Sequence, residues 1–358
     1  MSVRGNPTKT ILEPPKETPV VAEADVCVVG GSCTGVFAAV RAARLGASVV
    51  LIEKQNCFGG TATSGLVNIW HSLHDIDHKQ KIIGGLTEEM LQRLRRRDAV
   101  IESPADEQMA YKLDTEELKF ELDRLVLDEK RINPLLHTLY ACPILEDGHL
   151  QGVIVESKSG RGAILARTFV DASGDGDLAA HCGVPFAIHE TRQPPSTCAK
   201  IWDMPDLKKC NWQAMIEEHG EEFSLKSGFP WFAEIPGVPG AVMVAASRVF
   251  GANCADVRQL TEAEFEGRRQ IRATIDLVRK YGPRENNPRV LAISSHIGIR
   301  ETRRFECRHH LSEEEVLEGV RFDDAIANGT YRVDVHHSDH TGITFKYLDG
   351  RQEFAREG

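Results

Sequence analysis

The sequence has no long apolar run, no basic tract and no signal peptide, and each absence excludes a class of protein. No stretch approaches the ~20 apolar residues that a membrane-spanning helix needs. The formal net charge of −10, without a run of Lys or Arg, argues against a nucleic-acid partner. Residues 1–24 are proline-rich and lack the apolar core of a leader sequence, so we expect an extended arm on a cytoplasmic protein.

Paired cysteines are also missing. The nine cysteines are scattered and form no CxxC motif, which indicates reduced thiols and no disulfide framework or structural metal. His71, His74 and His78 have a spacing that would share one face of a helix, but their segment lacks a helical pattern. We therefore predict no metal site, and we keep His71 as a candidate that lines a substrate pocket.

What the sequence does contain is a strand–helix–strand pattern near its start. Residues 26–29 and 49–52 are short, wholly apolar runs of the kind that forms buried parallel strands. Between them, apolar residues recur at helical spacing over 36–43, and Gly46 is placed to end the helix. This order predicts a Rossmann-like βαβ unit.

The turn between the first strand and the helix carries a glycine motif. It consists of Gly30, Gly31, Ser32, Cys33, Thr34 and Gly35, with Ser32 at the second of the three glycine positions of GxGxxG. Small residues there allow a tight turn, a close approach of the backbone to a pyrophosphate and close helix packing. The helix N-terminus then attracts the phosphates. Glu53, at the end of the second strand, is placed to accept hydrogen bonds from ribose hydroxyls.

Further signals predict the rest of the α/β fold. Residues 135–139, 152–155 and 163–170 are expected strands, separated by turn signals at 147–148 and 159–160, and they predict a β-meander. Three helices are expected to begin at capping pairs, which are Asp114 with Glu117, Thr261 with Glu264, and Ser312 with Glu315.

Two later segments distinguish the kind of dinucleotide. Gly59, Gly60, Thr61, Ala62 and Thr63 follow the second strand, after Lys54. Ala172, Ser173, Gly174 and Asp175 follow another strand far downstream. With the βαβ motif and the segments 298–304 and 311–327, they make residues 25–347 resemble the FAD-dependent oxidoreductase family of the glutathione-reductase-like superfamily, which is related to fumarate-reductase flavoproteins.

The resemblance implies FAD as the cofactor, bound by all the residues of these two segments and of the glycine motif, with Glu53 and Lys54. It also implies that Tyr140 lies near the adenine. Family members continue past this point with a strand, a Gly-Arg segment and a helix that closes over the flavin, so we expect a C-terminally incomplete chain that alone binds FAD weakly or not at all.

The predicted organisation is a Rossmann-like FAD-binding domain, a parallel sheet with a β-meander, with an inserted α+β substrate domain. The expected divisions are an arm at 1–24, the FAD domain at 25–186, the substrate domain at 187–290 and a return to the FAD domain at 291–358. The length of 358 residues is appropriate for about two domains.

The reaction is predicted from candidate charged residues and from two missing motifs. Thr61 to Trp70 contains no cysteine, and no second GxGxxG follows, so neither thiol–disulfide chemistry nor a separate NAD(P)H domain is expected. Arg300 and His336 are the candidate catalytic residues, because an arginine can stabilise reduced flavin and a histidine can transfer the substrate's proton. Arg303 is an alternative to Arg300, with a structural salt bridge as its competing interpretation.

We therefore expect an FAD-dependent oxidoreductase that transfers hydride between the flavin and a small polar metabolite, with an unknown electron acceptor. The alternatives are an NAD-dependent Rossmann dehydrogenase and a non-catalytic nucleotide-binding protein.

Overall fold

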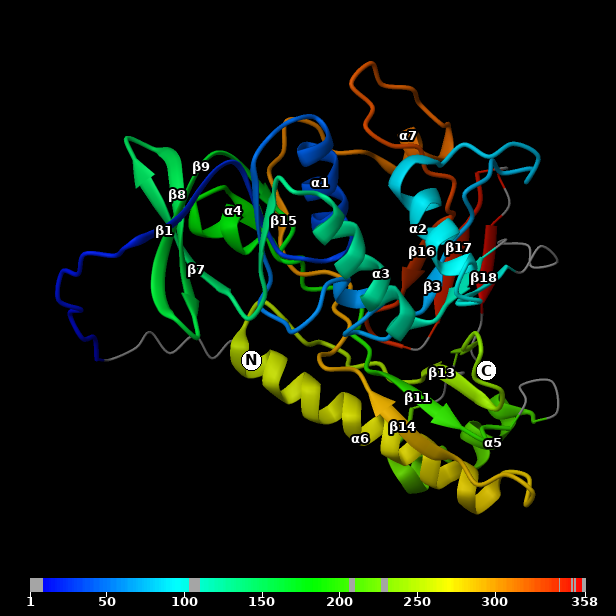
Figure 1. Cartoon of the computed structure of the whole chain (residues 1–358). Coiled ribbons are helices and arrows are strands. Elements are labelled where there is room, and N and C mark those ends of the chain that lie inside the picture. Colours follow the sequence, from blue (N-terminus) through cyan, green and yellow to red (C-terminus); the bar gives the residue numbers. More distant parts are fainter. Residues whose placement is uncertain are drawn as a thin grey trace.

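The computed structural model describes residues 9–102, 110–205, 210–226, 231–340, 342–348, 350 and 352–355. Its largest element is a six-stranded sheet in the order β6-β2-β1-β9-β8-β7 (Figure 1). The strands are β1 (Val20–Val29), β2 (Val49–Ile52), β6 (Ile132–Leu135), β7 (Leu139–Glu146), β8 (His149–Ser157) and β9 (Gly160–Asp171). β6, β2, β1 and β9 run parallel, and β9, β8 and β7 form an antiparallel meander. The predicted α/β class and Rossmann-like sheet are confirmed.

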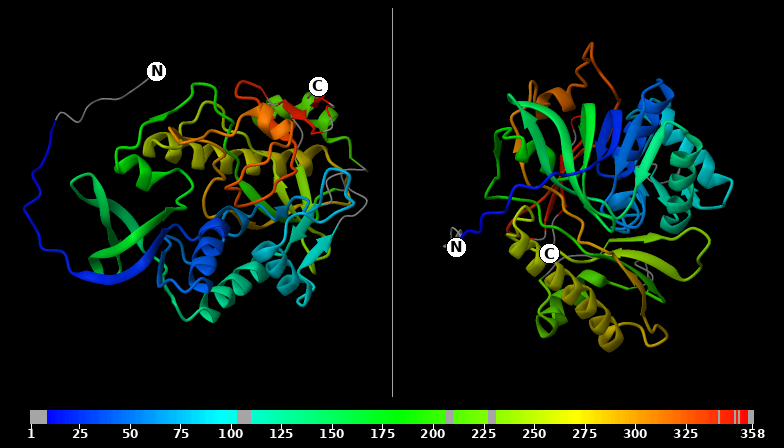
Figure 2. Two further views of the ribbon diagram at one scale, coloured as in Figure 1. Left: turned by 90° about the horizontal axis from the view of Figure 1, so that it is seen from above. Right: turned by 60° about the vertical axis from the view of Figure 1, so that its left-hand side comes forward.

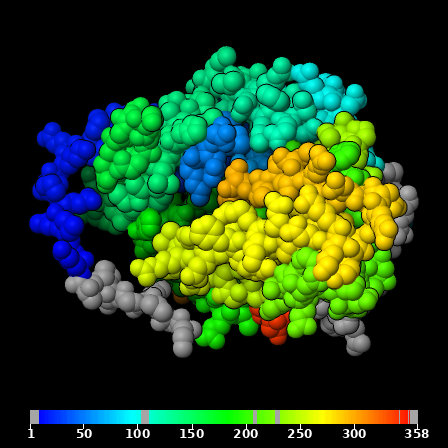
Figure 3. Space-filling view, turned by 90° about the horizontal axis from the view of Figure 1, so that it is seen from below, coloured from blue at the N-terminus to red at the C-terminus, as the bar shows by residue number. Residues whose placement is uncertain are grey.

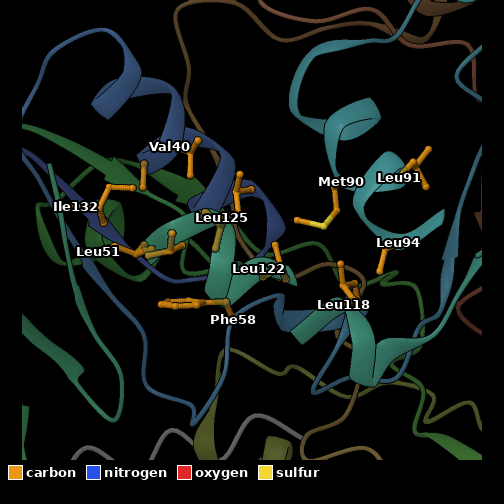
Figure 4. Packing of buried hydrophobic residues seen from close by; sticks show 14 of the residues in the cluster. Val40, Leu51, Phe58, Met90, Leu91, Leu94, Leu118, Leu122, Leu125 and Ile132 are labelled. Carbon is orange, nitrogen blue, oxygen red and sulfur yellow. The ribbon is translucent and has the colours of Figure 1, made fainter. Parts of the chain in front are cut away.

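Two helices, α1 (Cys33–Arg44) and α3 (Thr115–Asp128), cover one face of the parallel strands, and α2 (Gly85–Arg95) packs on α3. Apolar residues of α1, including Val40, pack with Leu51 of β2 and with Leu122 and Leu125 of α3, and α2 extends the same core through Met90 (Figure 4). Because these side chains are almost fully buried, this core fixes where α1 begins relative to the strand ends.

Below this region lies a second sheet, in the order β12-β13-β11-β14 (Figure 1). Its strands are β11 (Cys198–Trp202), β12 (Trp231–Glu234), β13 (Ala241–Ala245) and β14 (Arg289–Ile293). The 25-residue helix α6 (Val257–Tyr281) packs on it, because Ile271 and Ile275 at helical spacing are buried against Ala199, Ile201 and Val244 of the sheet. Helix α5 (Trp212–His219) packs on the C-terminal half of α6, against Leu277 and Val278.

The remaining elements are short. They are β3 (Ile69–Trp70), β4 (Val100–Glu102), β5 (Tyr111–Leu113), α4 (Asp177–His181), β10 (Phe186–Ala187), β15 (Arg304–Phe305), α7 (Glu313–Leu317), β16 (Val333–His336), β17 (Ile343–Lys346), β18 (Gln352–Ala355), and the 3-10 turns η1 (Gly60–Ala62) and η2 (Gly220–Phe223). β10 precedes the second sheet in the chain and pairs with β15, which follows it. After the second sheet, the chain therefore returns to the part that holds the six-stranded sheet, which we call the first region; the second sheet with α5 and α6 is the second region. The strands β16–β18 form their own antiparallel sheet.

Two predicted helix starts are confirmed and one is wrong. Asp114 caps α3, and Ser312 with Glu315 forms the capping box of α7. Helix α6, however, begins at Val257 with Asp256 as its cap, whose side chain accepts hydrogen bonds from the backbone N–H groups of residues 258 and 259. Thr261 therefore lies inside the helix, where its hydroxyl donates to the carbonyl of Val257.

Other predicted element boundaries also differ from those in the structure. The strand expected at 135–139 is interrupted, because β6 ends at Leu135 and β7 starts at Leu139, with His137 at a φ of 50° between them. The arm predicted for residues 1–24 joins the sheet from Val20 onward, and its first eight residues lie outside the described residues. Figure 2 shows residues 9–19 as an extended segment that runs away from the body.

All nine cysteines are free thiols, as predicted. Within the described ranges, no helix combines the length and the apolar character that crossing a membrane would require.

Candidate functional site

A cleft lies at the carboxyl ends of β1, β2 and β9, where the predicted dinucleotide segments meet. The backbone N–H of Gly30 donates to the carbonyl of Ile52 at 2.9 Å, and that of Ala172 donates to Val29 at 2.8 Å. The N–H of Gly59 donates to the carbonyl of Gly31 at 2.8 Å. These bonds hold three segments from distant parts of the sequence at one edge of the sheet, which is where open α/β sheets bind ligands.

The glycine turn needs two of its glycines for steric reasons. Gly30 has a φ of +104°, and a Cβ there would lie 2.3 Å from the carbonyl oxygen of Ala172. A Cβ on Gly35 would lie 1.9 Å from the carbonyl oxygen of Gly30. The first and third glycines therefore let α1 pack directly against the strand ends, so that its N-terminus points at the cleft.

Ser32 replaces the second glycine without strain. Its φ is −60° and its ψ is 173°, which any L residue adopts. It serves as the N-cap of α1, and its hydroxyl accepts a hydrogen bond from the N–H of Gly35 at 3.3 Å. The first N–H groups of a helix have no partner within the helix, so the residues after Ser32 present donors and a positive dipole end to an anion.

Glu53 is buried beside this turn, with 7% of its surface exposed. One carboxylate oxygen accepts from the N–H of Gly31 at 2.6 Å, and the other accepts from the N–H of Gln55 at 2.7 Å. Because each carboxylate oxygen can accept more than one hydrogen bond, both stay able to receive hydroxyl donors from a ribose. The carboxylate thus orders the glycine turn while it faces the cleft.

The cleft has a volume of about 250 Å³. Many of the predicted cofactor residues line it, namely Gly30, Ser32, Glu53, Lys54, Gly60, Thr61, Tyr140, Ala172, Ser173, Gly174 and Asp175. The other predicted residues do not line it, namely Gly31, Cys33, Thr34, Gly35, Gly59, Ala62 and Thr63. Thr63 is fully buried, and its hydroxyl donates to the carbonyl of Phe58 at 2.6 Å. Burial also raises the pKa of the Cys33 thiol to about 12.

The opposite wall of the cleft comes from the second region and was not predicted. It is formed by Leu260, Glu264, His296, Ile297 and Ile299. Glu264 of α6 accepts the N–H of Ile297 at 2.7 Å, which ties the helix to the segment after β14. Figure 3 shows α6 in yellow across this face, beside a blue segment of the first region. No sequence motif signals this wall, because it depends on how two distant regions pack.

Asp175 occupies the end of the cleft near the return segment. Burial raises the pKa of its carboxyl, while a hydrogen bond of 2.8 Å from the hydroxyl of Thr302 opposes that rise. Arg303 donates to the carbonyl of Asp175 and forms an ion pair of 2.8 Å with Asp177. The side chain of Arg303 is only 13% exposed, and its salt bridge to a neighbouring acid is the contact that the competing interpretation expects.

Tyr140, on β7, also lines the cleft. Its ring stacks on His181 of α4 at a centroid distance of 5.6 Å, and its hydroxyl lies 3.3 Å from Nδ1 of His181. The ring is thereby fixed at the rim where the resemblance places an adenine.

Arg300 and His336, the candidate catalytic residues, belong to a second cluster beside the cleft. Ile299, the residue before Arg300, lines the cleft, and His336 ends β16. The surrounding protein and the charge of Arg248 lower the pKa of Arg300. Desolvation, followed by the positive charges of Arg300 and Arg248, lowers the pKa of His336 to about 3. The imidazole of His336 is therefore neutral over the physiological range.

Two further residues of the 331–336 segment complete this cluster. Nε2 of His336 lies 3.5 Å from an oxygen of Asp334, whose other oxygen accepts the Tyr331 hydroxyl at 2.9 Å. The Tyr331 ring stacks on His71 at a centroid distance of 3.9 Å. His71 thus joins the cluster, whereas His74 lies in a bridge with Lys81 outside any helix. In the described part of the chain, no group of His, Cys, Asp or Glu side chains is arranged to hold a metal ion.

These features fit a flavin dinucleotide. The N-terminus of α1 suits a diphosphate, Glu53 suits ribose hydroxyls, and the fixed ring of Tyr140 suits an adenine.

Comparison with known proteins gives the family. Residues 25–354 match the family described as FAD dependent oxidoreductase. The mitochondrial dihydrolipoyl dehydrogenase of Schizosaccharomyces pombe is 32% identical over an alignment of 92 residues, which covers 23% of this chain and 18% of that protein. The chain therefore spans less than a fifth of that relative.

Solved structures resemble the chain more distantly. The p-nitrophenol 4-monooxygenase of Pseudomonas putida has 12% identity and a TM-score of 0.47, with 76% of this chain and 66% of that one covered. A geranylgeranyl bacteriochlorophyll reductase-like protein of Thermoplasma acidophilum has 15% identity and a TM-score of 0.49, with 77% and 66% covered.

Proposed function

Since this chain belongs to the FAD dependent oxidoreductase family, we propose that it is a dehydrogenase or reductase that moves a hydride between FAD and a small polar metabolite. One observation carries the proposal. The glycine turn, Glu53 and the segment at Asp175 line one cleft, and Ile299 on the wall of this cleft directly precedes Arg300. The cleft proposed for the cofactor thus adjoins the segment that carries part of a polar cluster.

When bound, FAD supplies a two-electron donor or acceptor, and the protein must supply binding, orientation and proton handling. With FAD bound, the N–H groups at the start of α1 would hold the diphosphate, and the carboxylate of Glu53 would hold the ribose. The buried wall at Ile297 and the half-buried Ile299 exclude water from the side of the cleft that α6 covers.

Proton transfer is assigned to His336. Removal of a hydride from an alcohol or amine carbon also releases a proton from the attached oxygen or nitrogen, and a neutral imidazole can accept it. His336 is neutral and 18% exposed, and its Nδ1 atom has no hydrogen-bond partner within the described residues. Asp334 accepts the hydroxyl of Tyr331 and lies near Nε2, the other ring nitrogen of His336. We therefore assign Asp334 as the residue that positions the His336 imidazole.

An anaerobic substrate screen tests the proposal. Because weak FAD binding is expected for this chain alone, it is saturated with excess FAD and mixed without oxygen with hydroxy acids, amino acids, polyols and their oxidised forms. The visible flavin absorption is then followed. We expect at least one member to bleach or restore this absorption, and His336→Asn to slow that reaction about 100-fold or more without loss of bound FAD.

Other results would contradict it. A chain whose bound flavin is reduced by dithionite but by no metabolite would be a non-catalytic flavin-binding protein. A chain that binds NAD in preference to FAD would be a nicotinamide-dependent dehydrogenase.

A further inference from the structure

Residues 295–302, which follow β14, are fixed at both ends beside the segments expected to bind FAD. At one end, the backbone N–H of Ser295 donates to the carbonyl of Ser64 at 2.8 Å. At the other end, the hydroxyl of Thr302 donates to the carboxylate of Asp175 at 2.8 Å. Three residues between these ends line the cleft, namely His296, Ile297 and Ile299. The 295–302 segment is therefore a wall of the cleft whose position is set by the dinucleotide segments themselves.

A short series of contacts connects His296 to the start of α1. The residue before it, Ser295, is bonded to Ser64, as described above. Four residues before Ser64 lies Gly60, where a Cβ would come within 3.0 Å of the Cβ of Ser32, the N-cap of α1. Gly60, Ser32 and His296 all line the cleft. The imidazole therefore faces the same cleft as the helix start, which suits a diphosphate, but from another wall.

One ring nitrogen of His296 is available to a ligand. Nδ1 lies 3.1 Å from the carbonyl oxygen of Ile297, and because a carbonyl only accepts, Nδ1 carries a hydrogen. The N–H of Ile297 donates in turn to Glu264 of α6 at 2.7 Å, which fixes the residue that orients the ring. Nε2 has no hydrogen-bond partner within the described part of the chain. The half-buried imidazole is thus held through Nδ1, and Nε2 remains for a group in the cleft.

The charges around the cleft favour a further cation when a diphosphate enters. The titratable residues that line it are Glu53, Lys54, Asp175, Asp177, Glu264, Tyr140 and His296. Asp177 and Glu264 already form ion pairs with arginines, at 2.8 Å and 2.7 Å. Lys54 then faces the carboxyl groups of Glu53 and Asp175, although burial raises the pKa of Asp175. Because the diphosphate of FAD adds two negative charges, a positive imidazolium is a compensating group that the lining can supply.

We propose that the imidazolium of His296 donates its Nε2–H to the diphosphate of FAD, from the wall formed by the 295–302 segment. A hydrogen bond from an ionised donor to a phosphate oxygen is among the stronger ones in proteins. Through Ile297 and Glu264, this contact would link the cofactor to α6, so that FAD connects the two regions. The proposal depends on FAD as the cofactor and does not depend on hydride transfer.

NMR titration with two ligands tests the proposal. The isotope-labelled chain is titrated near neutral pH with ADP-ribose, whose diphosphate is esterified at both ends as in FAD, and separately with adenosine, which lacks the diphosphate. Since one charge-assisted hydrogen bond is lost, ADP-ribose should bind His296→Gln about tenfold more weakly than the wild type, and adenosine should bind both equally. The control His149→Gln, at an exposed position on β8, should bind both ligands as the wild type does.

A second measurement uses the wild type alone and therefore does not depend on how well the variant folds. Saturation with ADP-ribose, or with excess FAD, should shift both ring nitrogens of His296 to the chemical shifts of an imidazolium. Ring nitrogens that keep the shifts of a neutral imidazole in the saturated complex would exclude donation from Nε2.

Other results of the titration would also overturn the proposal. Equal affinity of ADP-ribose for the wild type and His296→Gln would show that the imidazole does not bind the diphosphate. If adenosine binding falls as much as ADP-ribose binding in the variant, His296 only supports the wall of the cleft. A wild-type chain that binds neither ligand would refute the dinucleotide cleft itself. Failure of the hydride-transfer function is a separate result, because neither ADP-ribose nor adenosine contains a flavin.

Discussion

Protonation of His336 should weaken the fold as the pH falls. In the unfolded chain this imidazole titrates near its ordinary pKa of 6.5, whereas in the fold its pKa is about 3. Between these values the unfolded chain holds the extra proton, so the free energy of unfolding decreases as the pH falls through this window. Integration of the linkage relation from pH 7 to pH 5 gives a loss of at most about 2 kcal/mol from this group.

The measurement compares the wild type with His336→Asn, which removes the titrating group. Urea unfolding at pH 7 and at pH 5 gives each chain's change in unfolding free energy. We expect the wild type to lose about 2 kcal/mol more than the variant over this range. The control His149→Asn, at an exposed position on β8, should behave as the wild type does. An equal loss in His336→Asn and wild type would refute the desolvated environment of His336 and the charge cluster around it.

Two further predictions concern the cleft. Gly35→Ala places a Cβ 1.9 Å from the carbonyl oxygen of Gly30, so it should lower the free energy of unfolding by about 1–3 kcal/mol and weaken FAD binding, whereas Gly329→Ala, in open space, should do neither. Arg303→Gln breaks the 2.8 Å ion pair with Asp177 and should cost about 1–3 kcal/mol in urea unfolding. A variant at Arg303 with wild-type stability and weaker FAD binding would instead place this arginine on the cofactor.

Local signals explain which parts of the fold could be predicted. The strand expected at residues 49–52 coincides with β2, and the helix expected before Gly46 ends at Arg44. Both could be predicted because a run of apolar residues indicates a buried strand and a glycine indicates a helix end, and each signal needs only a few adjacent residues. The start of α6 could not be chosen in the same way. Both Asp256 and Thr261 precede suitable helical residues, so the sequence offers two possible starts. In the structure the side chain of Asp256 accepts the N–H groups of residues 258 and 259, and the helix begins there.

The site was predictable where it depends on the βαβ unit and unpredictable where it depends on long-range packing. Glycine spacing and Glu53 identify the first wall of the cleft from the amino-acid sequence alone. Glu264 and His296 form part of the second wall only because α6 folds back over the first region. The ion pair of Arg303 likewise joins residues 126 positions apart, which no periodicity reveals.

The most direct test of the central claim is a crystal structure of the chain grown with FAD. The account predicts the diphosphate within hydrogen-bond distance of the backbone N–H groups at the start of α1, and a ribose hydroxyl on the carboxylate of Glu53. A dinucleotide bound elsewhere, or a Glu53 carboxylate turned away from it, would contradict the account.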